Sequence, residues 1–351
     1  MTRSLPADVY GRPQVYERER RTLFAREWLL VAHEAEIPSP GDARALLLAG
    51  WPVFVRRGRD GALRAFHNVC RHRAGPLLWD DEERCETIRC RYHGWVYDDA
   101  GRLVRAPHFG EPGPDGASDI ALAPIRLETW HGLVFLNLDP DAPGLDRLLA
   151  PLEEPVAALD LASFRLHSRA SHPIACDWKV YVENYLEGYH VPALHPKLRA
   201  EIDWRSYRVE VHGDDGLVTH HTDSAASVAA TVYGGLWAWL APNAALNVYQ
   251  GGMSLERMLP TGPDAMRVEY SFLFREHTPE LERAAALAMC ARVTEEDRQV
   301  CEAVQRNLAG GVYQSGPLSP RHENGVAAFQ RWWRKRVGQG ATEGGGAGRA
   351  P

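Results

Sequence analysis

Two short segments of the chain each place a cysteine close to a histidine. Cys70 is followed by His72, and after a further 17 residues Cys90 is followed by His93. Structural zinc sites use two cysteines and two histidines, but they usually leave two or more residues between paired ligands, whereas one residue separates Cys70 from His72. A [2Fe–2S] cluster with two cysteines on one iron and two histidines on the other fits both loops. Such a cluster has a higher reduction potential than one held by cysteines alone.

A second candidate metal site lies in the segment DWKVYVENYLEGYHVPALHP, residues 177–196. Residues 177–190 are predicted to form a helix that Pro192 ends, which leaves His195 in the following turn. The residues that share one face of this helix are Glu183, Glu187 and His190. Two histidines five residues apart across a helix end can meet at one metal ion. An Fe(II) site usually adds a carboxylate to such a pair.

The carboxylate is predicted on a helix over residues 294–309, with Thr294 as its N-cap. Asp297 falls within the apolar stripe of this helix, where an acid must be paired or bound to a metal. The stripe consists of Val293, Val300, Val304 and Leu308. The alternative is a first-turn carboxylate that the helix dipole stabilises. The upstream histidines favour the metal, so Asp297 is predicted to complete a 2-His-1-carboxylate triad, with Glu296 as the next candidate acid.

The elements that must position these residues fall into two groups. Short strand-like pieces between about residues 45 and 138 predict a small all-β module. The helices expected elsewhere cover residues 14–30, 177–190, 279–291, 294–309 and 321–337, and further strands cover residues 206–275. The predicted parts are a helical segment at 1–30 that packs on the catalytic domain, a cluster domain at 31–140, a catalytic domain at 141–338, and a glycine-rich disordered tail at 339–351.

Composition excludes several classes of protein. The 351 residues carry a formal net charge of −6, and no basic block indicates nucleic acid as a partner. The six cysteines are too sparse for a disulfide framework, which favours a reducing cytoplasm. The first residues contain no apolar core of a secretory signal.

One uncharged stretch, between Asp223 and Glu256, is longer than a membrane span requires. Polar residues, glycines and Pro242 interrupt it, and no charged flanks mark its ends. Apolar residues alternate on either side of a Pro-Asn turn, so the sequence predicts two buried antiparallel strands and no membrane partner.

Three segments together resemble one known family. CRHRAGPL and CRYHGWVYD are similar to the two cluster-binding boxes of Rieske proteins, and ENYLEGYHVPALHP is similar to an iron-binding segment. From about residue 25 to 335 the chain resembles the α component of the Rieske non-heme iron oxygenases, the ring-hydroxylating dioxygenase family. The resemblance implies an α+β fold with an N-terminal all-β Rieske domain and a C-terminal helix-grip domain, an antiparallel sheet around a long helix. It also implies that His190 and His195 bind Fe(2+) and that Glu187, where many members have Asp, bridges the two centres.

The resemblance further implies how electrons reach the iron. A separate flavin or ferredoxin-type reductase supplies two electrons, and the cluster passes them to the iron for reaction with O2 and a small organic substrate. The chain has no GxGxxG motif and no P-loop, which agrees with nicotinamide and flavin binding elsewhere. In the family the cluster of one subunit serves the iron of its neighbour, so a homotrimer is expected.

The substrate is the least specified part of the sequence. GLWAWLAPNAALNVYQ and GVYQSGPLSPRHENGV are similar to choline and glycine-betaine monooxygenases, which favours a quaternary ammonium or N-methyl substrate. The aromatic residues that would form a cation–π cage are Tyr233, Trp237, Trp239 and Tyr249, although each of them also suits a strand core. Aromatic ring hydroxylation is the alternative activity, and a Rieske electron-transfer protein is the non-enzyme alternative.

Overall fold

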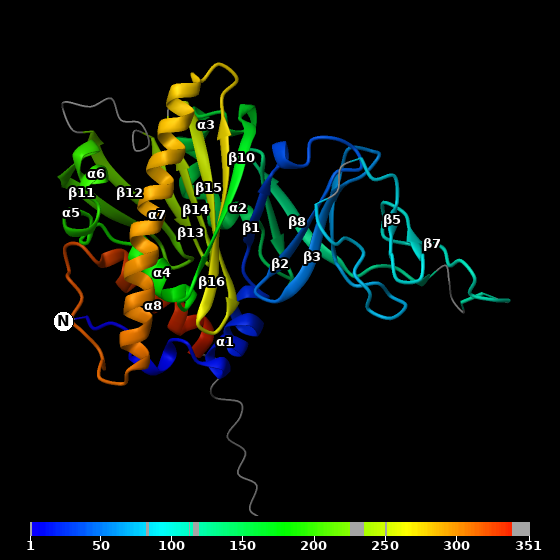
Figure 1. Ribbon diagram of the computed structural model, residues 1–351, viewed down its shortest axis with the longest axis horizontal. Coiled ribbons are helices and arrows are strands. Elements are labelled where there is room, and N and C mark those ends of the chain that lie inside the picture. Colours follow the sequence, from blue (N-terminus) through cyan, green and yellow to red (C-terminus); the bar gives the residue numbers. More distant parts are fainter. Residues whose placement is uncertain are drawn as a thin grey trace, which may run out of the picture. The chain divides into compact units, whose positions relative to one another are not determined.

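The computed structural model describes residues 2–81, 84–111, 113–114, 119–224, 235–249 and 251–338. The chain divides into two compact units (Figure 1). One comprises Leu30–Ala142, and the other combines Met1–Leu29 with Pro143–Pro351. Tyr233 and the tail at 339–351 lie outside the described residues.

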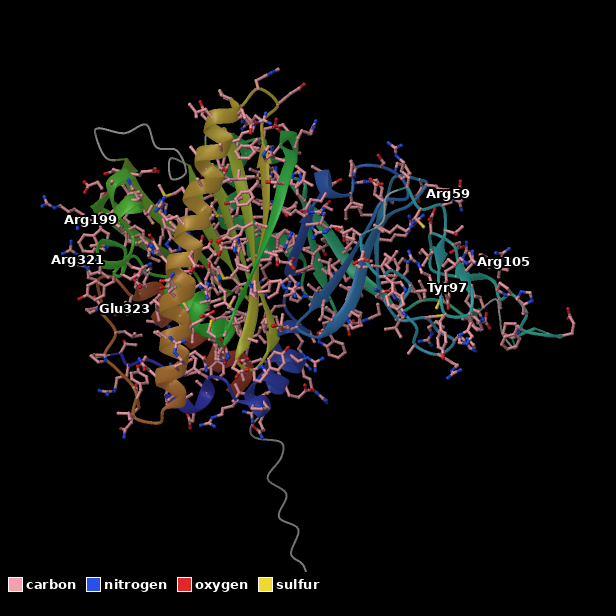
Figure 2. The ribbon with its side chains drawn as sticks, viewed as in Figure 1. Arg59, Tyr97, Arg105, Arg199, Arg321 and Glu323 are labelled. Atoms are coloured by element: carbon pink, nitrogen blue, oxygen red, sulfur yellow. The ribbon has the colours of Figure 1, made fainter. Side chains whose placement is uncertain are left out.

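The smaller unit is built from two sheets. Its six-stranded sheet has the order β1-β9-β8-β4-β3-β2, and its three-stranded sheet has the order β5-β6-β7. The strands of the larger sheet are β1 Leu29–His33, β2 Ala43–Leu48, β3 Trp51–Arg57, β4 Leu63–His67, β8 Pro124–Trp130 and β9 Leu133–Asn137. Those of the smaller sheet are β5 Ile88–Arg89, β6 Val96–Tyr97 and β7 Leu103–Arg105, and Figure 2 labels Tyr97 in this part. The predicted all-β module is confirmed.

The larger unit is an antiparallel sheet packed against helices. The strand order is β10-β16-β15-β14-β13-β12-β11. The strands are β10 Arg165–Ile174, β11 Ile202–His212, β12 Leu217–Ser224, β13 Leu236–Leu240, β14 Ala244–Val248, β15 Gly252–Gly262 and β16 Ala265–Phe274. Figure 1 shows the long helix α7, Glu280–Ala309, lying across this sheet. The remaining helices are α1 Pro13–Glu19, α2 Leu145–Leu149, α3 Glu153–Ala157, α4 Trp178–Tyr185, α5 Val191–Leu194, α6 Pro196–Glu201 and α8 Asn324–Val337. The predicted α+β class, with a sheet around a long helix, is confirmed.

The uncharged stretch forms the two strands that its pattern predicts. β13 and β14 pair antiparallel, from Leu236 opposite Val248 to Leu240 opposite Ala244. Most of their residues are buried. Among the described residues, no helix combines the length and the apolar character that a membrane span needs.

Four helix predictions were wrong in their boundaries, and three of them concern residues 14–30 and 279–309. The helix predicted at residues 14–30 ends at Glu19, continues as a π-helical turn over Arg20–Phe24, and gives way to β1. The two helices predicted at 279–291 and 294–309 are the single helix α7. Thr294 is therefore not an N-cap but lies in mid-helix, where its hydroxyl donates to the carbonyl of Cys290 at 2.8 Å.

The helix predicted at 177–190 ends at Tyr185, so Glu187 and His190 do not lie on its face. A close approach of the backbone at Gly188 explains this. A Cβ at Gly188 would lie 2.3 Å from the ring of Tyr207, and the Gly188 carbonyl accepts a hydrogen bond from Trp204 Nε1 at 2.6 Å. Pro192 does not end that helix but lies in the first turn of α5, where its lack of an N–H has no cost.

A buried ionic cluster fastens the N-terminal segment to the rest of its unit. Lys179 on α4 is fully buried, and its Nζ lies 2.7 Å from both Glu19 Oε1 and Asp177 Oδ2. The indole N–H groups of Trp178 and Trp333 also donate to Glu19, at 2.9 and 2.7 Å. One cation therefore neutralises two carboxylates that would otherwise be buried unpaired.

Lys179→Met is expected to destabilise the protein by about 3–5 kcal/mol, because it leaves both carboxylates buried without a cation. The matched control is Arg21→Met, which removes an exposed pair with Glu17 and is expected to have little effect on stability. Chemical denaturation followed by tryptophan fluorescence measures both. Equal shifts for the two variants would contradict a structural role for the buried cluster.

Candidate metal centres and substrate pocket

The two cluster loops close on themselves with the same hydrogen-bond pattern. The backbone N–H of Cys70 donates to Gly75 O and that of Cys90 to Trp95 O, both at 2.9 Å. The fourth residue after each cysteine returns a bond, from Ala74 N to Cys70 O and from Gly94 N to Cys90 O. Both of these residues have positive φ, +54° and +73°, which glycine adopts without strain. The positive φ at Gly94 therefore explains the glycine of the Gly-Trp pair in the second box.

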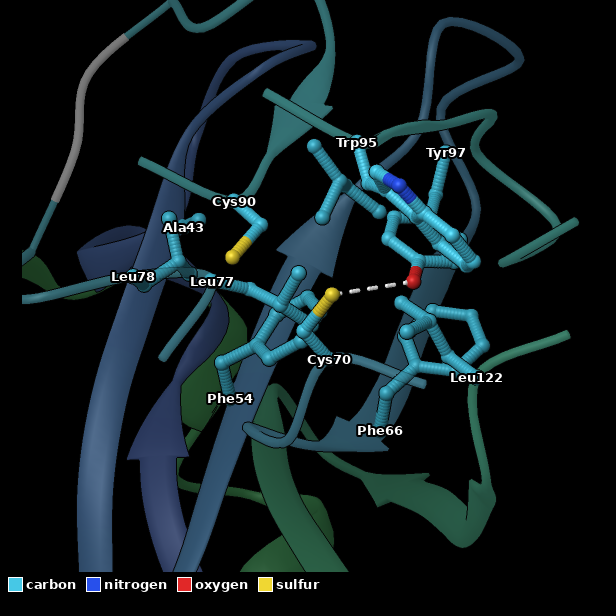
Figure 3. Close-up of a cluster of buried hydrophobic side chains, with 11 residues drawn as sticks. Ala43, Phe54, Phe66, Cys70, Leu77, Leu78, Cys90, Trp95, Tyr97 and Leu122 are labelled. Atoms are coloured by element: carbon cyan, nitrogen blue, oxygen red, sulfur yellow. Dashed lines mark hydrogen bonds between the residues drawn. The ribbon is translucent and has the colours of Figure 1, made fainter. Parts of the chain in front are cut away.

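The four candidate cluster ligands come together at one place. The Cys70 and Cys90 sulfurs lie in one buried hydrophobic cluster, and Figure 3 shows the Cys70 Sγ contact with Tyr97 Oη at 3.2 Å. The His72 and His93 rings lie 4.5 Å apart between centroids, and His72 stacks on Trp95.

Two details fit the bound cluster. His72 Nδ1 is buried and has no hydrogen-bond partner among the residues that the structure describes, as expected of a metal ligand. A side chain at Gly75 would meet Cys90 Sγ at 3.1 Å, so glycine leaves that sulfur accessible. A cluster with paired cysteine and histidine ligands suits this arrangement.

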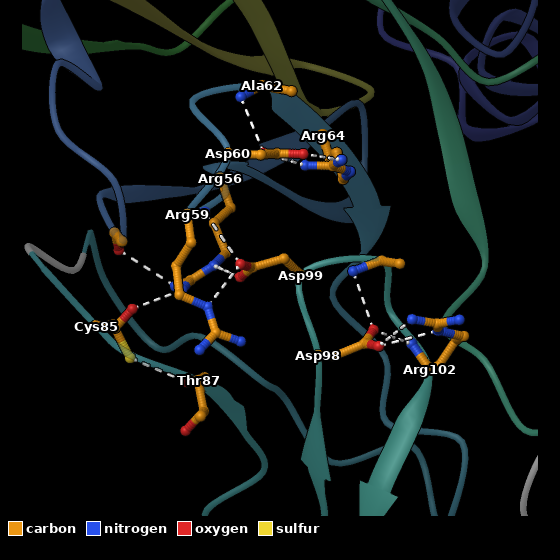
Figure 4. A network of polar contacts seen from close by, with 12 residues as sticks. Arg56, Arg59, Asp60, Ala62, Arg64, Cys85, Thr87, Asp98, Asp99 and Arg102 are labelled. Carbon is orange, nitrogen blue, oxygen red and sulfur yellow. Dashed lines mark hydrogen bonds and ion pairs between the residues drawn. The ribbon is translucent and has the colours of Figure 1, made fainter.

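Buried Arg56 on β3 contacts the chain segments that precede and follow the second cluster loop (Figure 4). Its guanidinium donates to the carbonyls of Gly41 and Cys85, and its Nε lies 3.2 Å from Asp99 Oδ1. Asp99 follows β6, and Cys85 precedes β5. Arg56 therefore ties together the chain segments on both sides of Cys90. Cys85 donates its thiol to the Thr87 carbonyl at 3.0 Å.

His190, His195 and Asp297 form a compact group on the larger unit. One potential ligand atom from each lies within 4.8 Å of the other two. His195 Nε2 is 3.0 Å and His190 Nε2 is 3.8 Å from Asp297 Oδ1. The short helix α5 explains the spacing of the histidines, because His190 immediately precedes it and His195 follows it. Asp297 reaches the group from α7.

A second set of polar side chains orients the first. Glu187 Oε1 lies 2.5 Å from His190 Nδ1, and Glu296 Oε2 lies 2.7 Å from His195 Nδ1. Asn184 Nδ2 donates to Asp297 Oδ1 at 2.7 Å. Because carboxylates occupy both Nδ1 positions, both Nε2 atoms are directed to the shared point, which is the usual arrangement around a metal-binding histidine. Glu296, the alternative ligand, contacts the outer nitrogen instead.

A pocket with aromatic walls opens beside this group. The lining residues include Tyr181, Tyr185, Trp237, Asn247, Ser254, Glu256, Tyr270, Cys290, Val293 and Thr294, together with His190, His195 and Asp297. Tyr185 Oη accepts a hydrogen bond from Trp237 Nε1 and donates to Asn247 Oδ1, which fixes two of the walls. The pocket therefore adjoins the candidate iron ligands His190, His195 and Asp297.

Of the four aromatic residues considered for a cage, the structure describes three. Trp237 lines the pocket and stacks on His220 at 4.6 Å. Trp239 is fully buried and packs against Phe329, and Tyr249 packs against Phe274, so both belong to the core. Tyr181, Tyr185 and Tyr270 were missed because their inward orientation depends on tertiary packing. Glu256 was also missed, although a lone acid after a long uncharged run was a detectable signal.

The chain matches two known families in the order in which its domains occur. Residues 27–126 match the Rieske [2Fe-2S] domain, and residues 161–339 match the ring hydroxylating alpha subunit (catalytic domain). The second match covers more than half of the chain. The chain therefore belongs to the ring-hydroxylating α subunits of the Rieske non-heme iron oxygenases.

Individual relatives are distant but cover nearly the whole chain. The carnitine monooxygenase oxygenase subunit of Escherichia coli (strain K12) is 29% identical over 344 residues, which cover 93% of this chain and 91% of the relative. The glycine betaine monooxygenase oxygenase subunit of Chromohalobacter salexigens is 28% identical and covers 94% of this chain and 85% of the relative.

Solved structures give the same picture. The quaternary ammonium Rieske monooxygenase CntA in complex with L-carnitine has a TM-score of 0.83 and 25% identity, with 96% of each chain covered. Naphthalene 1,2-dioxygenase from Rhodococcus sp. has a TM-score of 0.78 at 21% identity, over 95% of this chain and 94% of that chain, and this likeness shows the fold alone.

Family membership confirms the predicted class of enzyme. The chain is an oxidoreductase of the Rieske oxygenase type, with a [2Fe–2S] cluster and a mononuclear iron as its cofactors. Oxygenase α subunits of this family take electrons from a separate reductase. A protein with a structural zinc site and a Rieske electron-transfer protein are therefore excluded as descriptions of the whole chain.

Proposed function

We propose that this enzyme hydroxylates a quaternary ammonium or N-methyl compound. The roles proposed for its residues are cluster binding by Cys70, His72, Cys90 and His93, and Fe(2+) binding by His190, His195 and Asp297. The observation that carries the proposal is the convergence of two imidazole Nε2 atoms and one carboxylate beside an aromatic pocket. Curated relatives that cover nearly all of this chain are named for carnitine and glycine betaine, which are quaternary ammonium compounds.

When bound, the two iron centres supply electrons and activate O2. The side chains of the protein orient the iron ligands and exclude water from the substrate. Glu187 and Glu296 each accept a hydrogen bond from an Nδ1–H group, which leaves Nε2 as the ligand atom of both histidines. Asn184 fixes the Asp297 carboxylate. The aromatic walls keep water from the substrate and offer their faces to a cation.

We also propose a homotrimer in which Glu187 links the cluster of one subunit to the iron of its neighbour. Glu187 touches His190 and also borders a second cavity, which Glu183, Val304 and Tyr313 help to line. It is thus accessible from a side of the iron group that the substrate pocket does not occupy. A CntA structure describes inter-subunit electron transfer in that enzyme. A separate flavin or ferredoxin-type reductase is the proposed donor.

The test of the substrate class is O2 uptake by the reconstituted enzyme with a reductase and a panel of candidates. Choline, glycine betaine and carnitine represent quaternary ammonium compounds, and naphthalene represents a neutral aromatic ring. We expect uptake and a hydroxylated or dealkylated product with at least one of the cations. Turnover of naphthalene alone would contradict the proposal and support ring hydroxylation.

His93→Cys tests the cluster assignment. Replacement of an imidazole by a thiolate is expected to retain a [2Fe–2S] centre but to lower its reduction potential, because thiolate stabilises the oxidised form. Turnover should fall, since the reductase can no longer reduce the cluster. Spectroelectrochemical titration measures the potential. An unchanged potential would show that His93 is not a ligand.

A further inference from the structure

Glu256 is a buried carboxylate in the wall of the substrate pocket. It lies on β15 opposite Tyr270 of β16 and Ala245 of β14, and only 4% of its surface is exposed. Tyr181 of α4 donates its hydroxyl to Glu256 Oε1 at 3.0 Å. Ser254, two residues earlier on the same strand face, also lines the pocket. The side chain therefore faces the space that the substrate occupies.

No cationic side chain among the described residues pairs with Glu256. Two other buried acids show the usual arrangement, since Glu19 pairs with Lys179 and Glu36 with Arg44. Arg257, next in sequence, instead approaches Ser271 and Glu269. A buried carboxylate without a cation carries a large desolvation cost. In Glu256 this cost raises the pKa to about 7, although the hydrogen bond from Tyr181 opposes the shift.

We infer that Glu256 recognises the positive charge of the substrate by serving as the counter-ion that the protein itself does not provide. This inference rests on the proposed function and names the residue that selects a cation. The same pocket is lined by the His190, His195 and Asp297 group, so a bound ammonium can lie between Glu256 and the iron. Tyr181, Tyr270 and Trp237 surround that space and add cation–π attraction.

The role of Glu256 can be tested with two ligands that have the same shape but differ in charge. Choline and 3,3-dimethylbutan-1-ol differ only in the central nitrogen or carbon atom, so they fill a pocket equally but differ in charge. An aromatic cage alone favours choline to a limited extent. A buried counter-ion makes a larger difference, because its loss leaves the substrate cation unpaired.

The experiment is calorimetric binding of choline and of 3,3-dimethylbutan-1-ol to the anaerobic holoenzyme. For Glu256→Gln we expect choline affinity to fall about 10–100-fold, with no change for the neutral alcohol. Glu256→Asp keeps the charge with a shorter reach and is expected to be intermediate, so it serves if the Gln variant does not fold.

Glu183→Gln is the matched control. Glu183 is a partly buried acid, burial likewise raises its pKa to about 7, and it hydrogen-bonds Tyr10 and Gln330 away from the substrate pocket. Its replacement should leave choline affinity unchanged.

The pH dependence gives an independent readout. Because a bound cation favours the ionised carboxylate, choline should bind more tightly at about pH 8 than at about pH 6 and release a proton at the lower pH. The groups that face Glu256 are Tyr181 on α4, Tyr270 on β16, and Cys290 and Asp297 on α7, while β14 offers only uncharged residues. Burial raises the pKa values of both tyrosines and of Cys290, so these groups stay neutral over this range. Glu256→Gln should abolish the proton release.

Two results would overturn the inference, and they differ. If Glu256→Gln binds choline as tightly as the wild type, Glu256 is only a structural acid and the proposed function stands. If the wild type binds neither choline, glycine betaine nor carnitine, the substrate class itself is wrong and the inference fails with it.

Discussion

Replacement of Asp297 with Ala is expected to remove the mononuclear iron and to reduce hydroxylation to background. Two imidazoles remain, and they lack the carboxylate that completes an Fe(II) triad. His190 and His195 would also lose the oxygen that lies closest to both Nε2 atoms. The visible spectrum of the cluster should not change, because Cys70 and Cys90 belong to the other compact unit. Iron analysis together with the absorption spectrum measures both centres.

Glu296→Gln is the matched control for Asp297→Ala. Glu296 is the adjacent acid on α7 and contacts His195 only at Nδ1. Its loss should weaken iron binding by about 10–100-fold and leave a saturable site, which is the usual effect of removing an outer partner of a ligand histidine. If Asp297→Ala retained iron while Glu296→Gln lost it completely, the ligand assignments of the two acids would have to be exchanged.

Glu187→Gln is expected to keep both metal centres and to permit reduction of the cluster, but to slow the passage of electrons to the iron. The carboxylate contacts His190 Nδ1 at 2.5 Å and accepts the backbone N–H of His190 at 3.2 Å, so its position is fixed on both sides. Gln keeps the size but not the charge. Stopped-flow measurement follows cluster reoxidation after pre-reduced enzyme is mixed with O2 and substrate. The reoxidation rate should fall by more than any loss of bound iron explains.

Two variants calibrate this result. Glu187→Asp keeps the charge but shortens the reach, and it should reoxidise at an intermediate rate. Glu183→Gln should reoxidise as the wild type, because Glu183 hydrogen-bonds Tyr10 and Gln330. Wild-type reoxidation in Glu187→Gln with full iron content would mean that this residue is not the bridge.

The cluster ligands could be proposed from sequence because their geometry is local. In each loop the cysteine and histidine are two or three residues apart, and hydrogen bonds within the loop set their orientation. Asp297 was proposed from a helix whose start was wrong. Asp297 does lie on the buried face of α7, but the apolar stripe did not define that face, because Val304 is exposed whereas Thr294, Cys301 and Gln305 are buried.

Other features depend on distant parts of the chain and could not be predicted. Glu187 and His190 were placed on one helix face, but contacts of Gly188 with Tyr207 and Trp204 end the helix early, and the two side chains meet in a turn. Glu256 faces the pocket because of the register in which β15 pairs with β14 and β16. The alternation of residues around Pro242 in the sequence does not define that register.

A single turnover without reductase tests most directly whether this enzyme oxygenates a quaternary ammonium compound. Pre-reduced enzyme with both iron centres filled is mixed with isotopically labelled O2 and the quaternary ammonium compound that gave the greatest O2 uptake. We expect cluster oxidation to accompany the formation of a product that carries labelled oxygen on a carbon of the substrate. Cluster oxidation with no labelled product from this compound would contradict the proposed function, because the protein would then transfer electrons without oxygenating the substrate.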